Sequence, residues 1–419
     1  MRRLLWVAAA VLIFAGVLIA QRPTFRAGVD LVAVDVRVID KDGHPIVDLK
    51  PGDFQVEIGG HKRSVVSADF VRIGTSTLSQ DTGPRAGAAP ETAGVAPPPD
   101  DGRFVIVAID AMSFDSTASR GVAAAIARFV GGFTPQDRVG LYTFPLGPKV
   151  EPTVDRAEVE RELGHLIGQA DDTQAITIAP SELVDISAGD PLATSRAVAR
   201  NCGAAGNPAP MRGRGESGGR LGACNPETCA GRVLCEVGNR LLQDEAGAVA
   251  SLGMFGDFLR GLGHAPGRKI VVLVSAGSPT SDRPGGRPDL GALPQELGGQ
   301  AAQANAAIYA LFLDQHLLSQ NRAEHSKGLG GSTDQGRDSA VLQQWLSLFA
   351  GSAGGVLLTD LVGDGDIVFN RVLSETSAYY LLGVAPDTED RDGRARELKV
   401  KVSRKGATVR SRTWITIGI

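Results

Sequence analysis

The sequence predicts an α/β fold in which a doubly wound, mostly parallel sheet is preceded by a small β module and followed by a β hairpin. Two continuous apolar runs rich in β-branched residues, 104–109 and 270–275, are typical of strands that a parallel sheet buries on both faces. Stretches with helical spacing of apolar residues, such as 116–133, lie between runs of this kind. Strands that alternate with helices in this way indicate a sheet covered by helices on both faces.

The composition excludes several classes of protein. The 419 residues hold 43 Lys and Arg against 47 Asp and Glu, a formal net charge of −4, so the chain lacks the basic surplus of a nucleic-acid-binding protein. Hydrophobic residues make up 43%, and after residues 1–20 no apolar run is long enough to cross a bilayer. The 53 Gly and 23 Pro, set against 5% aromatic residues, predict long loops beside a folded core.

Residues 1–20 predict export. Arg2 and Arg3 give a positively charged start and residues 4–20 carry no charge, which is the layout of a secretory signal peptide. Cleavage after Ala20 would place Leu18 where a small residue is preferred, so an uncleaved N-terminal anchor remains an alternative. We therefore expect a periplasmic, secreted or envelope-anchored protein, with membrane contact only through an uncleaved N-terminal segment.

The cysteines agree with export. All four fall within one short stretch of the chain: Cys202, Cys224, Cys229 and Cys235. An even number of clustered cysteines in an exported chain predicts disulfide bonds, and the three possible pairings remain open. A zinc site is the rival interpretation, but the spacing lacks the paired C-x2-C units that zinc sites usually show, and free thiols are the third possibility.

The N-terminal segment 25–73 predicts a small β-sandwich-like module. Every second residue from Val32 to Val38 is valine, and residues 53–58 alternate in the same way, as half-buried strands do. Gly59-Gly60 between two such stretches is typical of a hairpin turn. Residues 74–101 are rich in proline and glycine and predict an extended linker.

The segment 102–377 predicts the doubly wound domain. Its expected elements alternate along the chain: strands at 104–109, 138–144, 270–275, 308–313 and 356–358, and helices at 116–133, 155–168, 296–307, 342–350 and 366–376. The pattern breaks at 169–237, a glycine-rich insertion that carries all four cysteines. Residues 378–419 alternate again and predict a strand that leads into a C-terminal β hairpin.

Six stretches in this order resemble the bacterial von Willebrand factor A-related (VWFA-related) family of exported proteins. They include the run V-I-V-A-I-D and the run P-x-D-R-V-G-L-Y-T-F, and they occupy residues 40–45, 49–59, 105–110, 135–144, 267–277 and 379–402. The resemblance implies a Rossmann-like von Willebrand A domain between two β segments. It implies little about a specific activity, because the molecular roles of such proteins are mostly unassigned.

The resemblance also raises the question of a metal. Von Willebrand A domains often hold a divalent cation at the carboxyl edge of the sheet through a D-x-S-x-S loop, with further ligands from two other loops. Here Asp110 fits, but Met112 and Phe114 stand at the two serine positions and Ala276 stands where the third loop would supply Asp. The resemblance thus implies a degenerate metal-ion-dependent adhesion site.

Candidate ligands for Mg2+ or Ca2+ are still present in this loop. They are Asp110, Ser113 and Asp115, although the last two are out of phase with the family's pattern. Carboxylate and hydroxyl oxygens suit these hard cations, but one carboxylate with uncertain hydroxyls makes a poor site. We therefore expect no cofactor, with Mg2+ or Ca2+ as the alternative.

No catalytic motif supports an enzyme. The sequence contains no G-x-S-x-G elbow, no H-E-x-x-H and no phosphate-binding G-x-x-x-x-G-K-[ST]. The six histidines are scattered, without a paired carboxylate at diagnostic spacing. We expect a non-enzymatic protein, with an exported hydrolase of unrecognised site as an alternative.

These observations lead to one functional hypothesis. We expect an exported protein that binds another, unidentified protein in the cell envelope through the carboxyl edge of its sheet. The expected contact residues are Asp110, Met112, Ser113 and Phe114. The alternative is a divalent-cation-dependent adhesin or envelope assembly factor.

Overall fold

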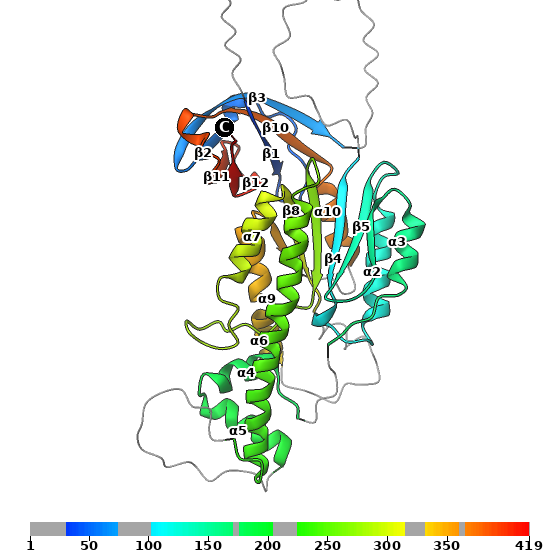
Figure 1. Cartoon of the computed structure of the whole chain (residues 1–419), viewed down its shortest axis with the longest axis vertical. Coiled ribbons are helices and arrows are strands. Elements are labelled where there is room, and N and C mark those ends of the chain that lie inside the picture. The colour runs from blue at the N-terminus through cyan, green and yellow to red at the C-terminus, as the bar shows by residue number, and fades with distance from the viewer. Residues whose placement is uncertain are drawn as a thin grey trace, which may run out of the picture.

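The computed structural model describes residues 31–73, 102–170, 176–203, 224–314, 332–359 and 365–418. The predicted signal peptide or anchor at 1–20, the predicted linker at 74–101 and part of the predicted insertion lie outside these residues. None of the helices in the described ranges combines the length and apolar character needed to cross a membrane. Two sheets form the centre of the molecule, and one lies over an edge of the other (Figure 1).

The larger sheet has seven strands and is entirely antiparallel, in the order β12-β1-β10-β3-β2-β11-β13. Its strands come from both ends of the chain: β1 (Val32–Ile39), β2 (Phe54–Ile58), β3 (His61–Arg72), β10 (Ala378–Ala385), β11 (Ala395–Val402), β12 (Thr408–Ser411) and β13 (Trp414–Thr416). β10 lies between β1 and β3, with Val34 opposite Leu382 in the register. The alternating valines of β1 face a core shared with β10, because Val34, Val36 and Leu382 are fully buried in one cluster.

The predicted fold class is therefore wrong. The largest sheet is antiparallel, and the smaller sheet is mixed, so the chain is not built on one mostly parallel, doubly wound Rossmann-like sheet. Residues 31–73 supply three strands and residues 378–418 supply four strands of a single sheet, where the sequence predicted a separate module and a separate hairpin. Local alternation predicts a strand but not its partner, and β1 and β10 pair across more than three hundred residues.

The smaller sheet has six strands in the order β6-β5-β4-β7-β8-β9. They are β4 (Phe104–Asp110), β5 (Arg138–Phe144), β6 (Lys149–Thr153), β7 (Lys269–Ser275), β8 (Ala306–Phe312) and β9 (Val356–Leu358). β6 is antiparallel to β5, and the other neighbours are parallel. The carboxyl ends of β4, β5, β7 and β8 therefore meet at one edge, away from the antiparallel sheet (Figure 1).

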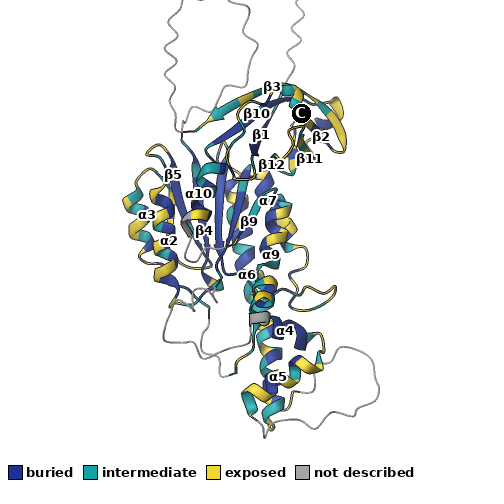
Figure 2. Ribbon diagram, turned by 180° about the vertical axis from the view of Figure 1, so that it is seen from behind, coloured by how far each residue is buried: buried dark blue, intermediate teal, exposed yellow. Residues whose placement is uncertain are grey.

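Helices cover both faces of this sheet. On one face α2 (Ser119–Gly131), α3 (Arg156–Leu163) and α10 (Gly365–Glu375) pack against Val105, Val107 and Ile109 of β4. On the other face α6 (Cys229–Leu262), α7 (Leu293–Gln303) and α9 (Ser332–Ser352) pack against Ile106 and Ala108. Figure 2 shows these strands buried and the outer faces of the helices exposed. The apolar run of β4 is continuous because both of its faces are covered.

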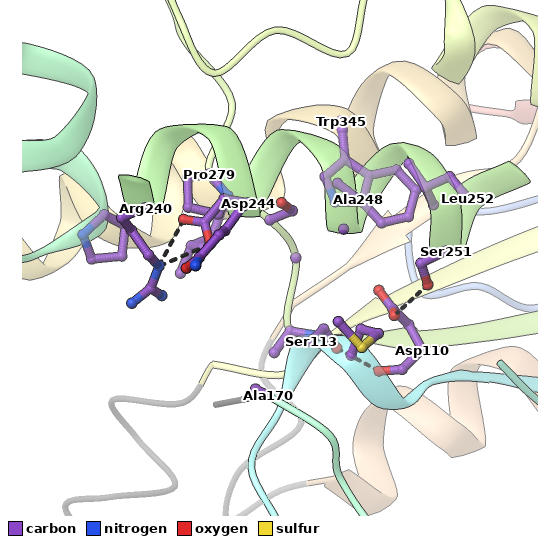
Figure 3. Close-up of a pocket in the computed structure, with 18 of the residues that line it drawn as sticks. Asp110, Ser113, Ala170, Arg240, Asp244, Ala248, Ser251, Leu252, Pro279 and Trp345 are labelled. Carbon is purple, nitrogen blue, oxygen red and sulfur yellow. Dashed lines mark hydrogen bonds and ion pairs between the residues drawn. The ribbon is translucent and has the colours of Figure 1, made fainter. Parts of the chain in front are cut away.

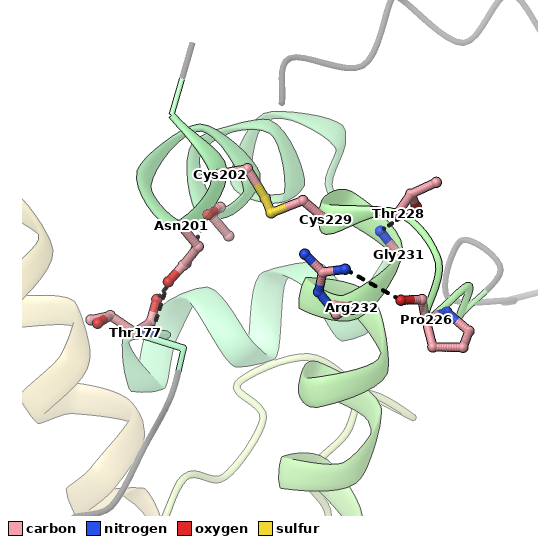
Figure 4. Close-up of a disulfide and its surroundings, with 9 residues drawn as sticks. Thr177, Asn201, Cys202, Pro226, Thr228, Cys229, Gly231 and Arg232 are labelled. Atoms are coloured by element: carbon pink, nitrogen blue, oxygen red, sulfur yellow. Dashed lines mark hydrogen bonds between the residues drawn. A yellow bond between two sulfur atoms is a disulfide. The ribbon is translucent and has the colours of Figure 1, made fainter. Parts of the chain in front are cut away.

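A small helical unit projects from the carboxyl edge of the sheet (Figure 1). It consists of α4 (Pro180–Ser187), α5 (Pro191–Cys202) and the first turns of α6, which bury a cluster that includes Leu183, Val198 and Val237. Two disulfide bonds, Cys202–Cys229 and Cys224–Cys235, lie in this unit, and Figure 4 shows the first of them joining α5 to α6. The prediction of disulfides is confirmed.

Candidate functional site

A cavity of about 260 Å³ opens at the carboxyl edge of the six-stranded sheet. Its floor is the end of β4 and the short 3-10 turn η2 (Ala111–Ser113), its walls are α6 and α9, and the loop after β7 closes a third side (Figure 3). Side chains at strand carboxyl ends gather at one edge of a parallel array, which is where ligands of such sheets bind.

Asp110 is the buried polar group at the base of this cavity. It ends β4 and is only 5% exposed, and its carboxylate accepts hydrogen bonds from the Ser275 hydroxyl (2.8 Å) and the Ser251 hydroxyl (3.3 Å). Burial raises the pKa of Asp110 to about 6, and the two hydroxyls only partly oppose this shift. No ion pair joins Asp110 to a cationic side chain in the part of the chain that the structure describes. The cavity thus contains a desolvated acid without a counter-charge.

Ser113 and Asp115 also line the cavity, but both have structural tasks. The Ser113 hydroxyl donates to the Asp110 carbonyl (2.7 Å) and accepts from the Ala276 backbone N–H (2.8 Å), so it ties η2 to the loop after β7. The Asp115 carboxylate accepts from the backbone N–H groups of Thr117 (2.7 Å) and Ala118 (3.0 Å) at the start of α2. The three predicted metal ligands, Asp110, Ser113 and Asp115, therefore line one cavity with their oxygens already engaged in hydrogen bonds.

Among the described residues, no group of three or more His, Cys, Asp and Glu side chains gathers closely enough to hold a metal ion. Ala276 stands at the third-loop position and offers no oxygen from its side chain. A hard cation such as Mg2+ needs six oxygens in near-octahedral geometry, and the oxygens of Asp110, Ser113 and Asp115 already form hydrogen bonds within the fold.

Phe114 is not a surface residue, so its prediction as a partner contact is wrong. Its side chain is fully buried in the core between the sheet and α2. Met112 is 38% exposed and lines the cavity beside Gly247 of α6. Met112 within η2 thus lies at the cavity, whereas Phe114, which follows η2 in extended conformation, lies in the core.

Two further exposed apolar residues, Leu146 and Ile167, lie outside the cavity lining on segments near η2. Leu146 is 72% exposed and Ile167 is 63% exposed, which is unusual for large apolar side chains. Gln169 links both segments to η2, since its side chain donates to the Leu146 carbonyl and its backbone N–H donates to the Ala111 carbonyl (2.7 Å). Met112, Leu146 and Ile167 are here called the apolar rim; Met112 lines the cavity, and the other two are exposed on segments that Gln169 links to η2.

The opposite wall holds residues that the sequence analysis missed. Arg240 and Asp244 of α6 form an ion pair (2.8 Å), and burial raises the pKa of Asp244 although Arg240 opposes the shift. Trp345 of α9 is 1% exposed, and its indole Nε1–H is buried without a hydrogen-bond acceptor among the described residues. Arg240, Asp244 and Ser251 recur on one side of α6 at spacings of four and seven, a helical pattern that could have indicated a common face.

Comparisons with known proteins add no family. No family model matches this chain, and no curated protein matches it. Among solved structures, 65% of this chain aligns with 45% of proximal thread matrix protein 1 from the mussel byssus, at 12% identity and a TM-score of 0.24. This chain therefore covers less than half of that protein, and a similarity so low carries no argument about fold or function.

Proposed function

We propose that this chain is an exported, non-enzymatic protein that binds another protein through the carboxyl edge of its six-stranded sheet. The observation that carries the proposal is the apolar rim beside a cavity whose base is an uncompensated buried acid. Exposed large apolar side chains near a cavity can contribute to an interaction surface, because water contact with them costs free energy that a partner recovers.

The cavity and the apolar rim have complementary tasks in this proposal. The apolar rim supplies contact area, and the cavity receives a side chain from the partner, as the central pockets of protein interfaces do. Asp110 can pair with a hydrogen-bond donor or a cation on that side chain, and Trp345 Nε1 can donate to an acceptor. Each of these buried groups gains a partner on binding, which favours association.

Export is supported by the disulfide bonds. Cys202–Cys229 and Cys224–Cys235 would form and persist in an oxidising compartment such as the periplasm or the cell exterior. The predicted signal peptide or anchor at residues 1–20 supports the same placement.

The proposal is tested by capturing the partner from the native envelope with the purified chain and then measuring affinity with the purified partner. Asp110→Asn should weaken binding by about tenfold, since it removes a charged anchor from a desolvated site. Asp257→Asn on the exposed end of α6 is the matched control and should bind like the wild type. Equal affinities for the wild type and Asp110→Asn would contradict a role for this cavity.

The same measurement separates this proposal from a cation-dependent adhesin. Binding should be unchanged when EDTA replaces Mg2+ or Ca2+ in the buffer, because the oxygens of Asp110, Ser113 and Asp115 are already engaged in hydrogen bonds within the fold. Loss of binding in EDTA with recovery on adding Mg2+ would instead support the adhesin.

A further inference from the structure

A second, smaller cavity lies at the junction of the two sheets, at the edge opposite the Asp110 cavity. Its volume is about 20 Å³, and its walls are β1 and β12 of the antiparallel sheet and the segments that lead into β7, β8 and β9. Four of the residues that line it are arginines: Arg37, Arg268, Arg410 and Arg412. Arg37 is buried and the other three are partly exposed, and a buried guanidinium group is stable only with negative charge nearby.

The carboxylates near this cavity do not supply enough negative charge. Glu375 is fully buried and is already shared, since it accepts from Arg410 Nε (2.8 Å), from Arg371 Nε (2.9 Å) and from the Tyr309 hydroxyl (3.3 Å). Asp35 is the carboxylate that lines the cavity itself, and its charge acts on Arg268 and Arg412. Two carboxylates therefore face four lining arginines, with Arg371 as a fifth, and a surplus of positive charge remains.

Several donors in the cavity wall have no acceptor. Arg37 is 3% exposed and its Nε–H is buried without a hydrogen bond, and the same is true of the Nε–H of Arg412. Arg268 forms no hydrogen bond or ion pair with the described residues, and its guanidinium lies over the Tyr379 ring at 4.7 Å. Arginine can only donate, so these groups cannot satisfy one another.

The pKa of Arg268 is also shifted by its surroundings in this cavity. Burial lowers the pKa of Arg268 to about 10, and the charge of Arg37 lowers it further, while Asp35 only partly offsets both effects. The shift of the Arg268 pKa thus comes first from burial and second from the neighbouring charge of Arg37, with Tyr309 and Tyr379 acting in the opposite direction.

We propose that this cavity binds one small inorganic anion of the size of chloride, which joins the antiparallel sheet to the six-stranded sheet. The volume fits a single ion of this size, since a cavity of roughly 10–15 Å³ is the minimum for one water molecule. An anion accepts from the unpaired Arg37 and Arg412 donors and offsets the positive surplus. A water molecule would accept the hydrogen bonds but would leave that surplus in place.

The test uses the purified full chain in buffers of equal ionic strength that contain either chloride or gluconate, an anion too large for the cavity. Chloride should raise the thermal unfolding temperature above its value in gluconate, and the chloride-35 NMR line should broaden in the presence of the protein. Equal unfolding temperatures in the two salts, with no broadening, would overturn the proposal and leave water as the occupant.

A pair of variants tests whether chloride binds in this cavity. Arg268→Met removes a cavity arginine that holds no hydrogen bond in the fold and should weaken chloride binding by about tenfold, as loss of a charged donor does. Arg120→Met, on the exposed side of α2, is the matched control and should bind chloride like the wild type. If Arg268→Met fails to fold, the wild-type comparison of chloride with gluconate still decides the question. Chloride binding that is equal in both variants would place the ion elsewhere and overturn the assignment.

Discussion

Asp110 makes the stability of the folded chain depend on pH. Burial raises its pKa to about 6 from an ordinary 3.8, so the folded chain holds this proton more tightly than the unfolded chain does. The stability that this group contributes is therefore fully present below about pH 4 and is lost as the pH rises through about 6. At neutral pH the ionised carboxylate destabilises the fold, which is a cost typical of functional sites.

Asp110→Asn tests this cost. The amide cannot ionise, so the free energy of unfolding at about pH 7 should rise by about 1–3 kcal/mol, given about 1.4 kcal/mol for each pKa unit. Urea unfolding at about pH 7 and about pH 4 measures it, and the gain should vanish at the lower pH. A gain of equal size at both values would show that the effect does not come from ionisation.

Arg103 and Asp137 form a buried ion pair, so this buried carboxylate, unlike that of Asp110, has a counter-charge. Asp137 is fully buried, and burial alone would raise its pKa, but the hydrogen bonds and charge of Arg103 hold the pKa below its usual range. Arg103 also donates to the Leu373 carbonyl and the Thr376 hydroxyl, so the pair joins the start of β4 to the end of α10.

Arg103→Met should lower the free energy of unfolding by about 3–5 kcal/mol, because it leaves the buried Asp137 without a counter-charge. Arg161→Met is the control, since Arg161 is 64% exposed and should change stability little. Urea denaturation compares the two, and a loss no larger than that of the control would refute the assigned role.

At the scale of elements, the disulfides belong to the helical unit of α4, α5 and early α6. Cys202–Cys229 spans 27 residues in the sequence and joins the end of α5 to the start of α6. The hydrophobic cluster beneath it is small, so the cross-link should provide much of this unit's stability.

Replacement of Cys202 and Cys229 by serine should destabilise this unit by about 3–4 kcal/mol, the entropy gain of the freed loop in the unfolded state. Amide hydrogen exchange measured along the chain is the readout. Protection should fall in α4 and α5 and persist in β4 and β7. A uniform loss across both regions would show that the unit does not unfold separately.

Some of the helices, strands and disulfides could be predicted from the sequence, and others could not. The strands at 104–109 and 270–275 were predicted because both faces are apolar, and the disulfides were predicted because the cysteines cluster in a chain that carries an export signal. The helices α4 and α5 were missed, because glycine and polar residues around them hide a short amphipathic pattern. In the site, Asp110 and Met112 were found from the strand end, whereas Trp345 and Ser251 come from distant helices with no motif to mark them.

For the whole molecule, the antiparallel sheet ties the two ends of the chain together. β10 of the C-terminal segment lies between β1 and β3 of the N-terminal segment, and the three share one core. The predicted fold class failed at this point, because pairing between distant segments leaves no trace in local alternation.

Neither segment should fold alone. A fragment of residues 31–73 should be unfolded by circular dichroism, because β1 and β3 each lose a strand partner and the Val34 and Val36 side chains lose their cover. Mixing it with a fragment of residues 378–418 should restore strand signal in proportion to complex formation. A folded, dispersed NMR spectrum from 31–73 alone would contradict this dependence.

The central claim is that the apolar rim at the carboxyl edge of the six-stranded sheet binds a partner protein. The most direct measurement compares two leucines of equal exposure, because Leu146 on the apolar rim and Leu192 on α5 are both 72% exposed. Leu146→Asp should weaken binding of the captured partner by about tenfold or more, whereas Leu192→Asp should leave the affinity unchanged. Equal affinities for Leu146→Asp, Leu192→Asp and the wild type would contradict the claim.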